Sequence, residues 1–216
     1  LIKEIKPQFV FQYTLKPIIY GSIASYLSRV PKCFSMLSGL GFLFISNTKN
    51  PLKKLIKYIG RFLLFIALRN NSKIFFQNND DRQDLIRKKI INNQDTCLIN
   101  GSGVDLNYYQ FSELPNNASF LLIARMIKSK GIIEYIDAIR IVKNKYPETI
   151  FTLVGGVEEN IDAIGREDIN GWINEGLIEY KGELKDVRPV IKDCSVYVLP
   201  SYREGTSKSI LEAMAM

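Results

Sequence analysis

Short apolar runs alternate with amphipathic segments along the whole chain. In the first hundred residues, apolar runs predict strands at residues 8–12, 33–36, 73–77 and 96–99, and helical periodicity predicts helices at residues 1–6, 17–29, 51–69 and 78–89. Pro17 and Pro51 suit first helical turns, and residues 78–89 place acids at the start and bases at the end. This rhythm predicts parallel strands covered by helices.

The alternation continues more regularly in the second half. Predicted strands lie at residues 120–124, 149–154, 177–180 and 195–199, and predicted helices lie at residues 131–146, 160–174, 186–193 and from Ser207 onward. One apolar helical face is marked by Ile132, Ile136, Ile139 and Val142. Residues 101–117 are rich in turn formers and are the best candidate for a linker. An α/β fold with parallel sheets is therefore expected.

Glycines and charged residues follow the strands of the second half. After the four strands come, in order, ARMIKSKG, the pair Gly155 and Gly156, Gly182, and the string PSYREGTSKSILEAMAM. Ligands of parallel sheets bind outside the carboxyl ends of the strands. We therefore expect two cations, several glycines and two glutamates to meet at one edge of this sheet.

The last string has the features of an anion site. Gly205 lets the backbone approach a ligand closely, and Thr206 or Ser207 can cap the helix that follows. The N–H groups and the dipole at a helix start attract a phosphate. Arg125 and Lys130 would supply the remaining countercharge to a diphosphate.

Two glutamates flank this helix start. Glu204 precedes the helix and Glu212 lies inside it, on the order of 10 Å away at a rise of ~1.5 Å per residue. That separation is too great for a shared proton or metal, but it suits two sugar rings on either side of a diphosphate. Taken alone, such a pair would usually be a solvated acid and an ordinary helix residue; the neighbouring cations and glycine favour a site.

The amino-acid composition excludes several kinds of catalytic and metal site. Histidine is absent, which excludes histidine triads, metal ligands and general bases from this stretch. Cys33, Cys97 and Cys194 are widely spaced, which suits a reducing cytoplasm better than a disulfide scaffold. No signal peptide is recognised, and the longest apolar run is far below the ~20 residues that span a bilayer. Because the chain starts without Met and stops inside a predicted helix, we expect a fragment.

Charge is spread unevenly. Residues 1–100 carry 16 Lys and Arg against 5 Asp and Glu, a net charge of +11, whereas residues 101–216 carry 13 against 17, a net charge of −4. A basic first half favours an anionic partner, either a membrane surface or a phosphorylated lipid. Nucleic acid also fits the sign of the charge, and a merely solvated basic face is an equal alternative.

The predicted helix at residues 51–69 is amphipathic. Its apolar stripe consists of Leu52, Leu55, Ile56, Ile59, Leu63 and Ile66, and Lys53, Lys54, Lys57 and Arg61 lie away from the stripe. Such a helix suits a membrane surface. The alternative is a core helix packed on the sheet, which we favour for its second half; the cations at its start would then still reach lipid headgroups.

The chain resembles retaining glycosyltransferases of family 4, which have the GT-B fold. Glu204, seven intervening residues and Glu212 match that family's Glu-x7-Glu motif, and residues 120–131, 154–156 and 197–216 look like its donor domain. In the first half, YTLKPIIYGSIAS, SGLGF, FFQNNDDR and INGSGVD resemble the later part of its acceptor domain. The pattern is most similar to bacterial members that build O-antigen, capsule or protein-linked glycans on undecaprenyl diphosphate.

The resemblance implies two Rossmann-like domains with parallel sheets, both incomplete here. Residues 1–113 would be the C-terminal part of the acceptor-binding domain plus the linker, and residues 114–216 the N-terminal part of the nucleotide-sugar-binding domain. Many relatives carry a histidine near the reacting carbon. Since this stretch has none, its place would be taken by a residue in 13–16 or by one outside the given sequence, and the fragment alone is expected to be inactive.

The resemblance also implies roles at the donor phosphates. Arg125 and Lys130 would bind the diphosphate, and the N–H groups of Gly205, Thr206 and Ser207 would assist. No metal and no cofactor besides the nucleotide-sugar co-substrate is expected, because protein cations and a helix terminus neutralise the charge.

The other implied roles concern the sugars and the base. Glu204 would be the catalytic residue that holds the transferred sugar, and Glu212 would hold the ribose. Gly182, Glu183 and Leu184 would lie beside the base.

The implied activity is transfer, with retention, of a hexose or N-acetylhexosamine from a nucleotide sugar, UDP-linked by preference, to a polyprenyl-diphosphate-linked sugar. The enzyme would act in bacterial surface polysaccharide or glycan assembly, in the cytoplasm and peripherally on the inner face of the cell membrane, without a nucleic-acid partner. Two alternatives are a sugar-nucleotide epimerase of the same architecture and a basic nucleic-acid-binding module. The second lacks the interleaved aromatic and basic residues of an RNA platform.

Overall fold

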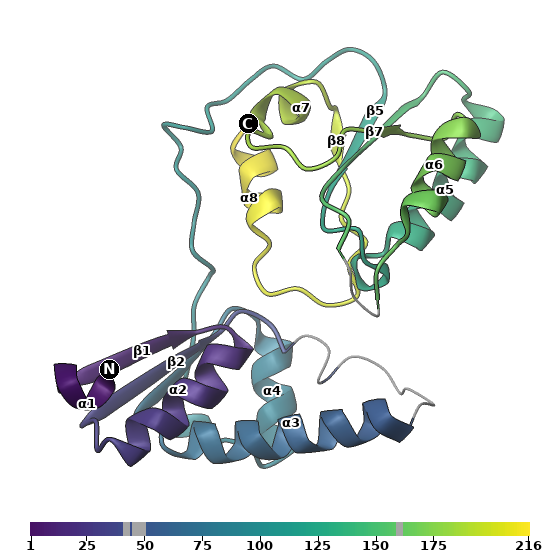
Figure 1. Cartoon of the computed structure of the whole chain (residues 1–216). Helices are drawn as coiled ribbons and strands as arrows, with labels where there is room; N and C mark the ends of the chain where they lie inside the picture. Colours follow the sequence, from purple (N-terminus) through teal and green to yellow (C-terminus); the bar gives the residue numbers. More distant parts are fainter. Residues whose placement is uncertain (41–43, 45–50, 159–161) are drawn as a thin grey trace. The chain divides into compact units, whose positions relative to one another are not determined.

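The computed structural model describes residues 1–40, 44, 51–158 and 162–216. The chain forms two compact units (Figure 1): unit 1 comprises Leu1–Ser102 together with Arg203–Thr206, and unit 2 comprises Gly103–Tyr202 together with Ser207–Met216. The predicted domain division after residue 113 lies in the same turn-rich stretch as the boundary at Gly103. The acceptor and donor roles given to the two domains stay predictions.

Unit 1 is built on a parallel sheet in the order β1-β2-β3-β4. Its elements are α1 (Ile2–Ile5), β1 (Phe9–Tyr13), α2 (Leu15–Leu27), β2 (Lys32–Leu37), α3 (Pro51–Arg69), β3 (Lys73–Phe76), α4 (Asn79–Arg87), the 3-10 turn η2 (Asn93–Asp95) and β4 (Thr96–Leu98). All strands and helices predicted for this half are present, with small shifts at their ends. The motif SGLGF, residues 38–42, lies partly outside the described residues.

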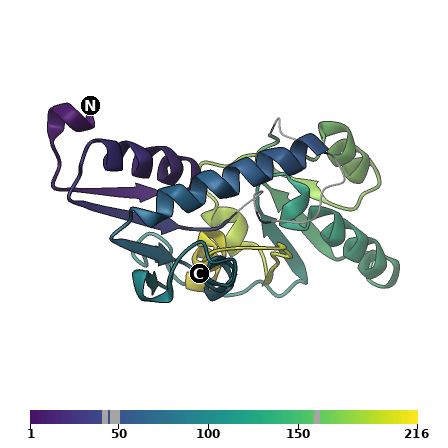
Figure 2. The same cartoon turned by 90° about the horizontal axis from the view of Figure 1, so that it is seen from below.

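The core of unit 1 lies between the sheet and its helices. Helices α2 and α3 lie side by side (Figures 1 and 2), and both contribute apolar side chains to the same buried cluster as β2 and β3. Leu64, Ala67 and Leu68 are buried, which confirms core packing for the second half of α3. In the described part of the chain, no helix combines the length and the apolar character that crossing a bilayer requires.

Unit 2 is built on a parallel sheet in the order β7-β6-β5-β8. Its elements are β5 (Ser119–Ile123), the 3-10 turn η3 (Lys128–Lys130), α5 (Ile132–Lys145), β6 (Ile150–Val154), α6 (Arg166–Asn174), β7 (Glu179–Tyr180), α7 (Arg188–Lys192), β8 (Val196–Tyr197) and α8 (Lys208–Ala215). Both faces of the sheet are covered: α5 and α6 pack on one face, and α7 and α8 on the other (Figure 1).

The apolar pattern of unit 2 is confirmed in its main features. Ile132, Ile136 and Ile139 are buried in the core, and Val142 packs against them. Strands β7 and β8 are shorter than predicted, because pairing with a neighbouring strand is limited to two residues in each.

The first described residues of the helix predicted from residue 160, residues 162–165, are not helical. Residues 159–161 lie outside the described residues, and Ala163 forms an extended bridge with Ile127. The N–H of Ile164 then donates to the Met126 carbonyl at 2.9 Å. This stretch is therefore held to the loop after β5, and α6 begins only at Arg166.

Candidate active site

The loops after β5, β6 and β7 are joined at the carboxyl edge of the unit 2 sheet. The N–H of Gly155 donates to the Gly182 carbonyl at 2.8 Å, and the N–H of Met126 donates to the Gly156 carbonyl at 3.0 Å. The segments that carry Arg125, Gly156 and Gly182 are thus hydrogen-bonded to one another. The strand-end rule correctly predicted where these segments meet.

Two glycines at this edge allow backbone segments to cross closely. Gly155 has a φ of +147°, and a Cβ atom there would stand 1.7 Å from the Ala124 carbonyl oxygen. Gly131 has a φ of +72°, and its Cβ would stand 2.1 Å from the Pro200 carbonyl oxygen. A side chain at either position would require the loops to separate. The absence of a side chain at these two glycines therefore allows the strand-end loops to pack closely against each other.

Residues 182–184 begin the loop after β7. Gly182 has a φ of +66°, and nothing lies within 4 Å of the position its Cβ would take. Glu183 reaches back to the loop after β6, since its Oε2 would lie 3.1 Å from a Cβ on Gly156. Leu184 packs against the buried cluster on the face covered by α7 and α8. Their predicted position beside a base stays a prediction.

Arg125 is exposed and forms an ion pair that the sequence did not reveal. Its Nη1 lies 3.3 Å and 3.4 Å from the two carboxylate oxygens of Glu158. The Arg125 and Glu158 side chains are 60% and 38% exposed, so solvent screens their attraction and the pair contributes little to stability. A diphosphate can therefore replace Glu158 as the partner of Arg125 at small cost. Lys130, the other predicted cation, is half-buried at the end of η3.

The amino end of α8 lies beside the end of β5. The Ser209 hydroxyl is 2.7 Å from the Tyr197 hydroxyl, which donates to the carbonyl of Ile123, the last residue of β5, at 3.2 Å. Ser207 is the N-cap residue, as predicted, but its hydroxyl lies 3.0 Å from the Ser209 hydroxyl and accepts no N–H of the helix. The predicted capping bond is therefore absent, and the first-turn amides keep the arrangement that binds anions.

Glu212 is buried in α8, where it is only 7% exposed. Its Oε1 accepts a hydrogen bond from the Tyr109 hydroxyl at 2.8 Å and lies 3.5 Å from the Lys208 Nζ. Burial and the hydrogen bond to Glu212 raise the pKa of Tyr109 to about 12. Sequence reasoning missed Tyr109, because no motif links two residues that are 103 positions apart.

The remaining predicted site residues, Glu204, Gly205 and Thr206, belong to unit 1. A Cβ on Gly205 would stand 2.1 Å from the Ser38 carbonyl oxygen, so the close approach expected at this glycine is to the protein's own backbone. The Thr206 hydroxyl donates to the Gln77 carbonyl at 3.3 Å instead of capping α8. Gly205 and Thr206 therefore contact Ser38 and Gln77, which were not predicted as partners of this segment.

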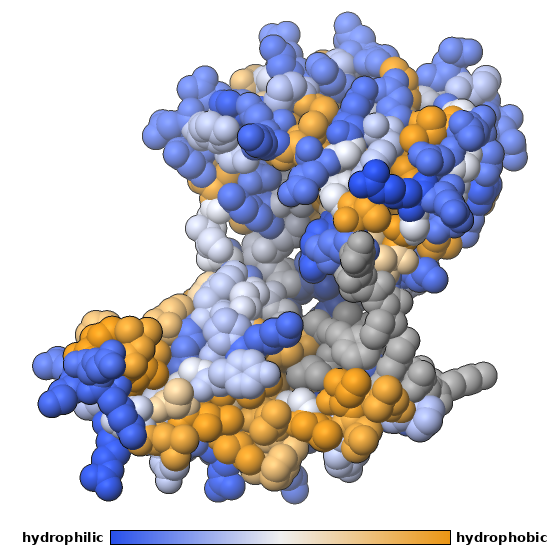
Figure 3. Space-filling model, viewed as in Figure 1, coloured by the Kyte–Doolittle hydropathy of each residue, from blue (hydrophilic) through white to orange (hydrophobic). Residues whose placement is uncertain are grey.

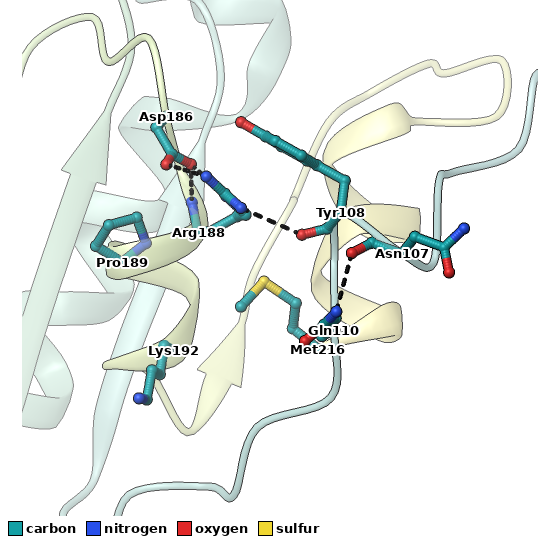
Figure 4. A pocket seen from close by; sticks show the side chains of 8 residues that line it. All are labelled: Asn107, Tyr108, Gln110, Asp186, Arg188, Pro189, Lys192 and Met216. Carbon is teal, nitrogen blue, oxygen red and sulfur yellow. Dashed lines mark hydrogen bonds and ion pairs between the residues drawn. The ribbon is translucent and has the colours of Figure 1, made fainter.

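A pocket of about 480 Å³ opens in unit 2 beside α7 (Figure 4). It is lined by Asn107, Tyr108, Gln110, Asp186, Arg188, Pro189, Lys192 and Met216. Arg188 is held by both carboxylate oxygens of Asp186, at 2.9 Å and 2.7 Å, and its guanidinium lies 3.8 Å from the centre of the Tyr108 ring. The Arg188 charge is therefore neutralised in place, and none of the predicted site residues lines this pocket.

Family models match both halves of the chain. The model described as "Glycosyl transferases group 1" matches residues 117–216, and the model described as "Glycosyl transferase 4-like" matches residues 1–78.

Named relatives align with the whole chain at low identity. The chain is 24% identical to the N,N'-diacetylbacillosaminyl-diphospho-undecaprenol alpha-1,3-N-acetylgalactosaminyltransferase of Campylobacter jejuni and covers 58% of that protein. It is also 24% identical to the UDP-Gal:alpha-D-GlcNAc-diphosphoundecaprenol alpha-1,3-galactosyltransferase of Escherichia coli and covers 57% of it. The chain therefore spans less than two thirds of the length of these relatives.

Solved structures share the fold. Anabaena Alr3699/HepE in complex with UDP matches 99% of this chain over 59% of its own length, with a TM-score of 0.73 and 20% identity. The lipopolysaccharide outer core galactosyltransferase WaaB matches 99% of this chain over 56% of its own length, with a TM-score of 0.64 and 17% identity. With its two parallel sheets and the two family matches, the chain belongs to the group 1, family 4-like glycosyltransferases of the GT-B fold.

Proposed function

We propose that the complete gene product transfers a hexose or N-acetylhexosamine from a UDP-linked donor to a polyprenyl-diphosphate-linked saccharide, with retention. Membership of the family supports glycosyl transfer. The name of the Escherichia coli relative contains UDP-Gal and a diphosphoundecaprenol, and the Anabaena structure holds UDP. One observation carries the proposal: the amino end of α8, which has no side-chain cap, lies beside the end of β5. Arg125 follows the last residue of β5, Ile123, by two positions.

The donor-binding roles proposed in unit 2 follow from charge and hydrogen bonding. Arg125, Lys130 and the first-turn amides of α8 from Ser207 bind the diphosphate, because cations and helix amides both favour phosphate oxygens. Glu212 accepts a hydrogen bond from a ribose hydroxyl, as it does from Tyr109 in the structure described here. Residues 182–184 lie beside the base.

In unit 1, Glu204 holds the transferred sugar, and the N–H groups of Gly205 and Thr206 assist at the phosphates. The acceptor hydroxyl oxygen forms a bond to the anomeric carbon while the bond from that carbon to the β-phosphate oxygen breaks. Attack from the face that the diphosphate leaves retains the configuration, and a phosphate oxygen takes the acceptor's proton. Positive charge at the donor site stabilises the departing nucleoside diphosphate more than the intact donor, which accelerates the step.

Product analysis tests this function. The complete gene product, given a UDP-sugar and a lipid-linked acceptor, should release UDP and form a glycosylated lipid of the corresponding mass. Arg125→Ala should lower kcat/KM by about 10²-fold, because a charge-assisted contact to the leaving diphosphate is lost. The fold should survive, since the Arg125 side chain is 60% exposed.

Arg140→Ala is the matched control, because Arg140 is also an exposed arginine of unit 2 that pairs with surface acids. Its kcat/KM should equal that of the wild type. An isomerised sugar nucleotide without glycosylated lipid would instead identify the epimerase alternative. Unchanged transfer by Arg125→Ala would remove the proposed donor site.

We also propose that α3 brings unit 1 to the inner face of the cell membrane. Leu55, Ile56, Ile59 and Phe62 are 56%, 49%, 51% and 60% exposed, and hydrophobic residues gather along this helix (Figure 3). The net charge of +11 on residues 1–100 adds attraction to anionic lipids. Lys57, one of the cations predicted to lie away from the stripe, is only 6% exposed and so adds little to the basic surface of α3.

Vesicle binding tests this surface. The double variant Leu55→Ser/Ile59→Ser should bind vesicles of phosphatidylglycerol and phosphatidylethanolamine at least about tenfold more weakly, because each buried aliphatic side chain contributes roughly 1.5–3 kcal/mol. Co-sedimentation over a range of lipid concentrations measures the difference. Ile141→Ser is the control, since Ile141 is 73% exposed on α5 of unit 2. Equal binding by the double variant and the wild type would contradict a role for α3.

A further inference from the structure

The segment Arg203–Thr206, which carries Glu204, is anchored to α4 by an ion pair outside the predicted site. The Arg203 Nε bonds the Asp81 carboxylate, and its Nη2 bonds the Asp84 Oδ2 at 2.7 Å. Asp81 and Asp84 stand three positions apart on α4, so one guanidinium bridges a full turn of the helix. The Asp81 side chain is 1% exposed and that of Arg203 is 20% exposed.

Both carboxylate oxygens of Asp81 are occupied. While Oδ1 bonds Arg203, Oδ2 accepts the N–H of Leu40 at 3.1 Å. The hydrogen bond from Arg203 lowers the pKa of Asp84 below its ordinary value, so Asp84 is ionised at neutral pH. The anchor is thus a charged and geometrically defined contact.

Asn78 adds a second anchor on the same helix. As the N-cap residue of α4, it accepts the N–H of Asp81 through Oδ1 at 2.7 Å. Its Nδ2 donates to the main-chain carbonyl of Glu204 at 2.8 Å. One side chain therefore caps the helix and holds the backbone at Glu204.

Stability alone does not account for this arrangement. Apolar side chains of similar volume often stabilise a protein as well as a buried ion pair does, because burying charges costs free energy. A forked guanidinium bound to two carboxylates instead defines one position and orientation. Arg203 is the residue next to Glu204. Fixing the position of the Arg203 side chain therefore also fixes the backbone that carries the Glu204 carboxylate.

We propose that Arg203 and Asn78 are positioning residues for Glu204: by holding its backbone to α4, they keep the carboxylate where the transferred sugar binds. The inference rests on the proposed function, in which Glu204 contacts that sugar. The Arg203 guanidinium binds Asp81 and Asp84, so Arg203 acts on the reaction only through its neighbour Glu204.

Steady-state kinetics of the complete gene product test the inference. Arg203→Gln should lower kcat by about 10²-fold, because displacement of a reacting contact by ~1 Å has effects of that size. The KM for the UDP-sugar should change much less, since Arg125 and Lys130 are untouched. Arg203→Lys should recover part of kcat, because lysine keeps the charge but not the fork.

Arg87→Gln is the matched control. Arg87 also pairs with Asp84, at 2.9 Å, but it is 69% exposed and makes its contacts within α4. Its kcat should equal that of the wild type. A drop in kcat as large as that of Arg203→Gln would show that any loss of charge on α4 is sufficient, and would overturn the proposal.

Asn78→Ser serves where Arg203→Gln does not fold. Serine is an equally good N-cap, but it lacks the amide donor to Glu204, so kcat should fall about tenfold while Tm falls by only a few degrees. If Glu204→Gln is inactive while folded Arg203→Gln and Asn78→Ser turn over like the wild type, the inference is overturned and the proposed function stands. If Glu204→Gln itself is fully active, the catalytic role proposed for Glu204 fails, and the inference fails with it.

Discussion

Glu204→Gln is expected to lower the kcat of the complete gene product by about 10²–10³-fold, the usual cost of removing one preorganised electrostatic contact to the transition state. Glutamine keeps the size of the side chain but has neither the charge nor two equivalent acceptor oxygens. The backbone of residue 204 should stay in place, because its carbonyl is held by Asn78 and the preceding Arg203 is bound to α4. Loss of turnover would therefore report the chemistry of the carboxylate.

The comparison with Glu212→Gln makes this experiment specific. Glu212 is assigned to the ribose, which does not react, so its variant should raise the KM for the UDP-sugar more than it lowers kcat. Transfer rates measured over a range of donor concentrations separate the two effects. Glu113→Gln, at an exposed linker position, is the neutral control. Turnover by Glu204→Gln at the wild-type rate would refute the assignment of Glu204.

Gly155→Ala is expected to destabilise unit 2 by roughly 3 kcal/mol or more, the range associated with backbone strain and forced core displacement. Its φ of +147° disfavours any residue with a Cβ, and that atom would lie 1.7 Å from the Ala124 carbonyl oxygen. The loops after β5 and β6 would have to separate. The hydrogen bond from Gly155 to Gly182 at 2.8 Å would then be strained as well.

Gly182→Ala provides the contrast. Gly182 also has a positive φ, +66°, but nothing lies within 4 Å of its Cβ position, so only the left-handed backbone is penalised, at about 1–2 kcal/mol. Urea unfolding followed by the fluorescence of Trp172, the single tryptophan and part of the unit 2 core, measures both variants. Equal destabilisation by the two substitutions would contradict the close crossing at Gly155.

Local pattern was sufficient for most of the fold. The α3 helix was predicted to its end residues, and Ile132, Ile136 and Ile139 were correctly placed in the core. Hydrophobic periodicity reports which face of an element is buried, and neighbouring residues carry that information. The start of α6 at Arg166 was not predicted, because it depends on the pairing of Ala163 with Ile127, which is a non-local contact.

The candidate site divides along the same line. The alternation of strands and helices and the strand-end rule were enough to bring the segments of Arg125, Gly156 and Gly182 together. The partners of the charged groups were not predictable: Glu158 for Arg125, and Tyr109 for Glu212. The space at Gly205 was also assigned to a ligand, whereas the Ser38 carbonyl fills it.

The sequence by itself determined the α/β class, the parallel strands, the core faces and the glycosyltransferase motif, because each depends on the spacing of residues within short segments. Only the tertiary structure decided which groups meet. Arg203 and Asp81 are 122 positions apart, and Tyr109 and Glu212 are 103 positions apart. Contacts between residues so far apart in the sequence depend on how whole elements pack, and no periodicity or motif within a single segment encodes them.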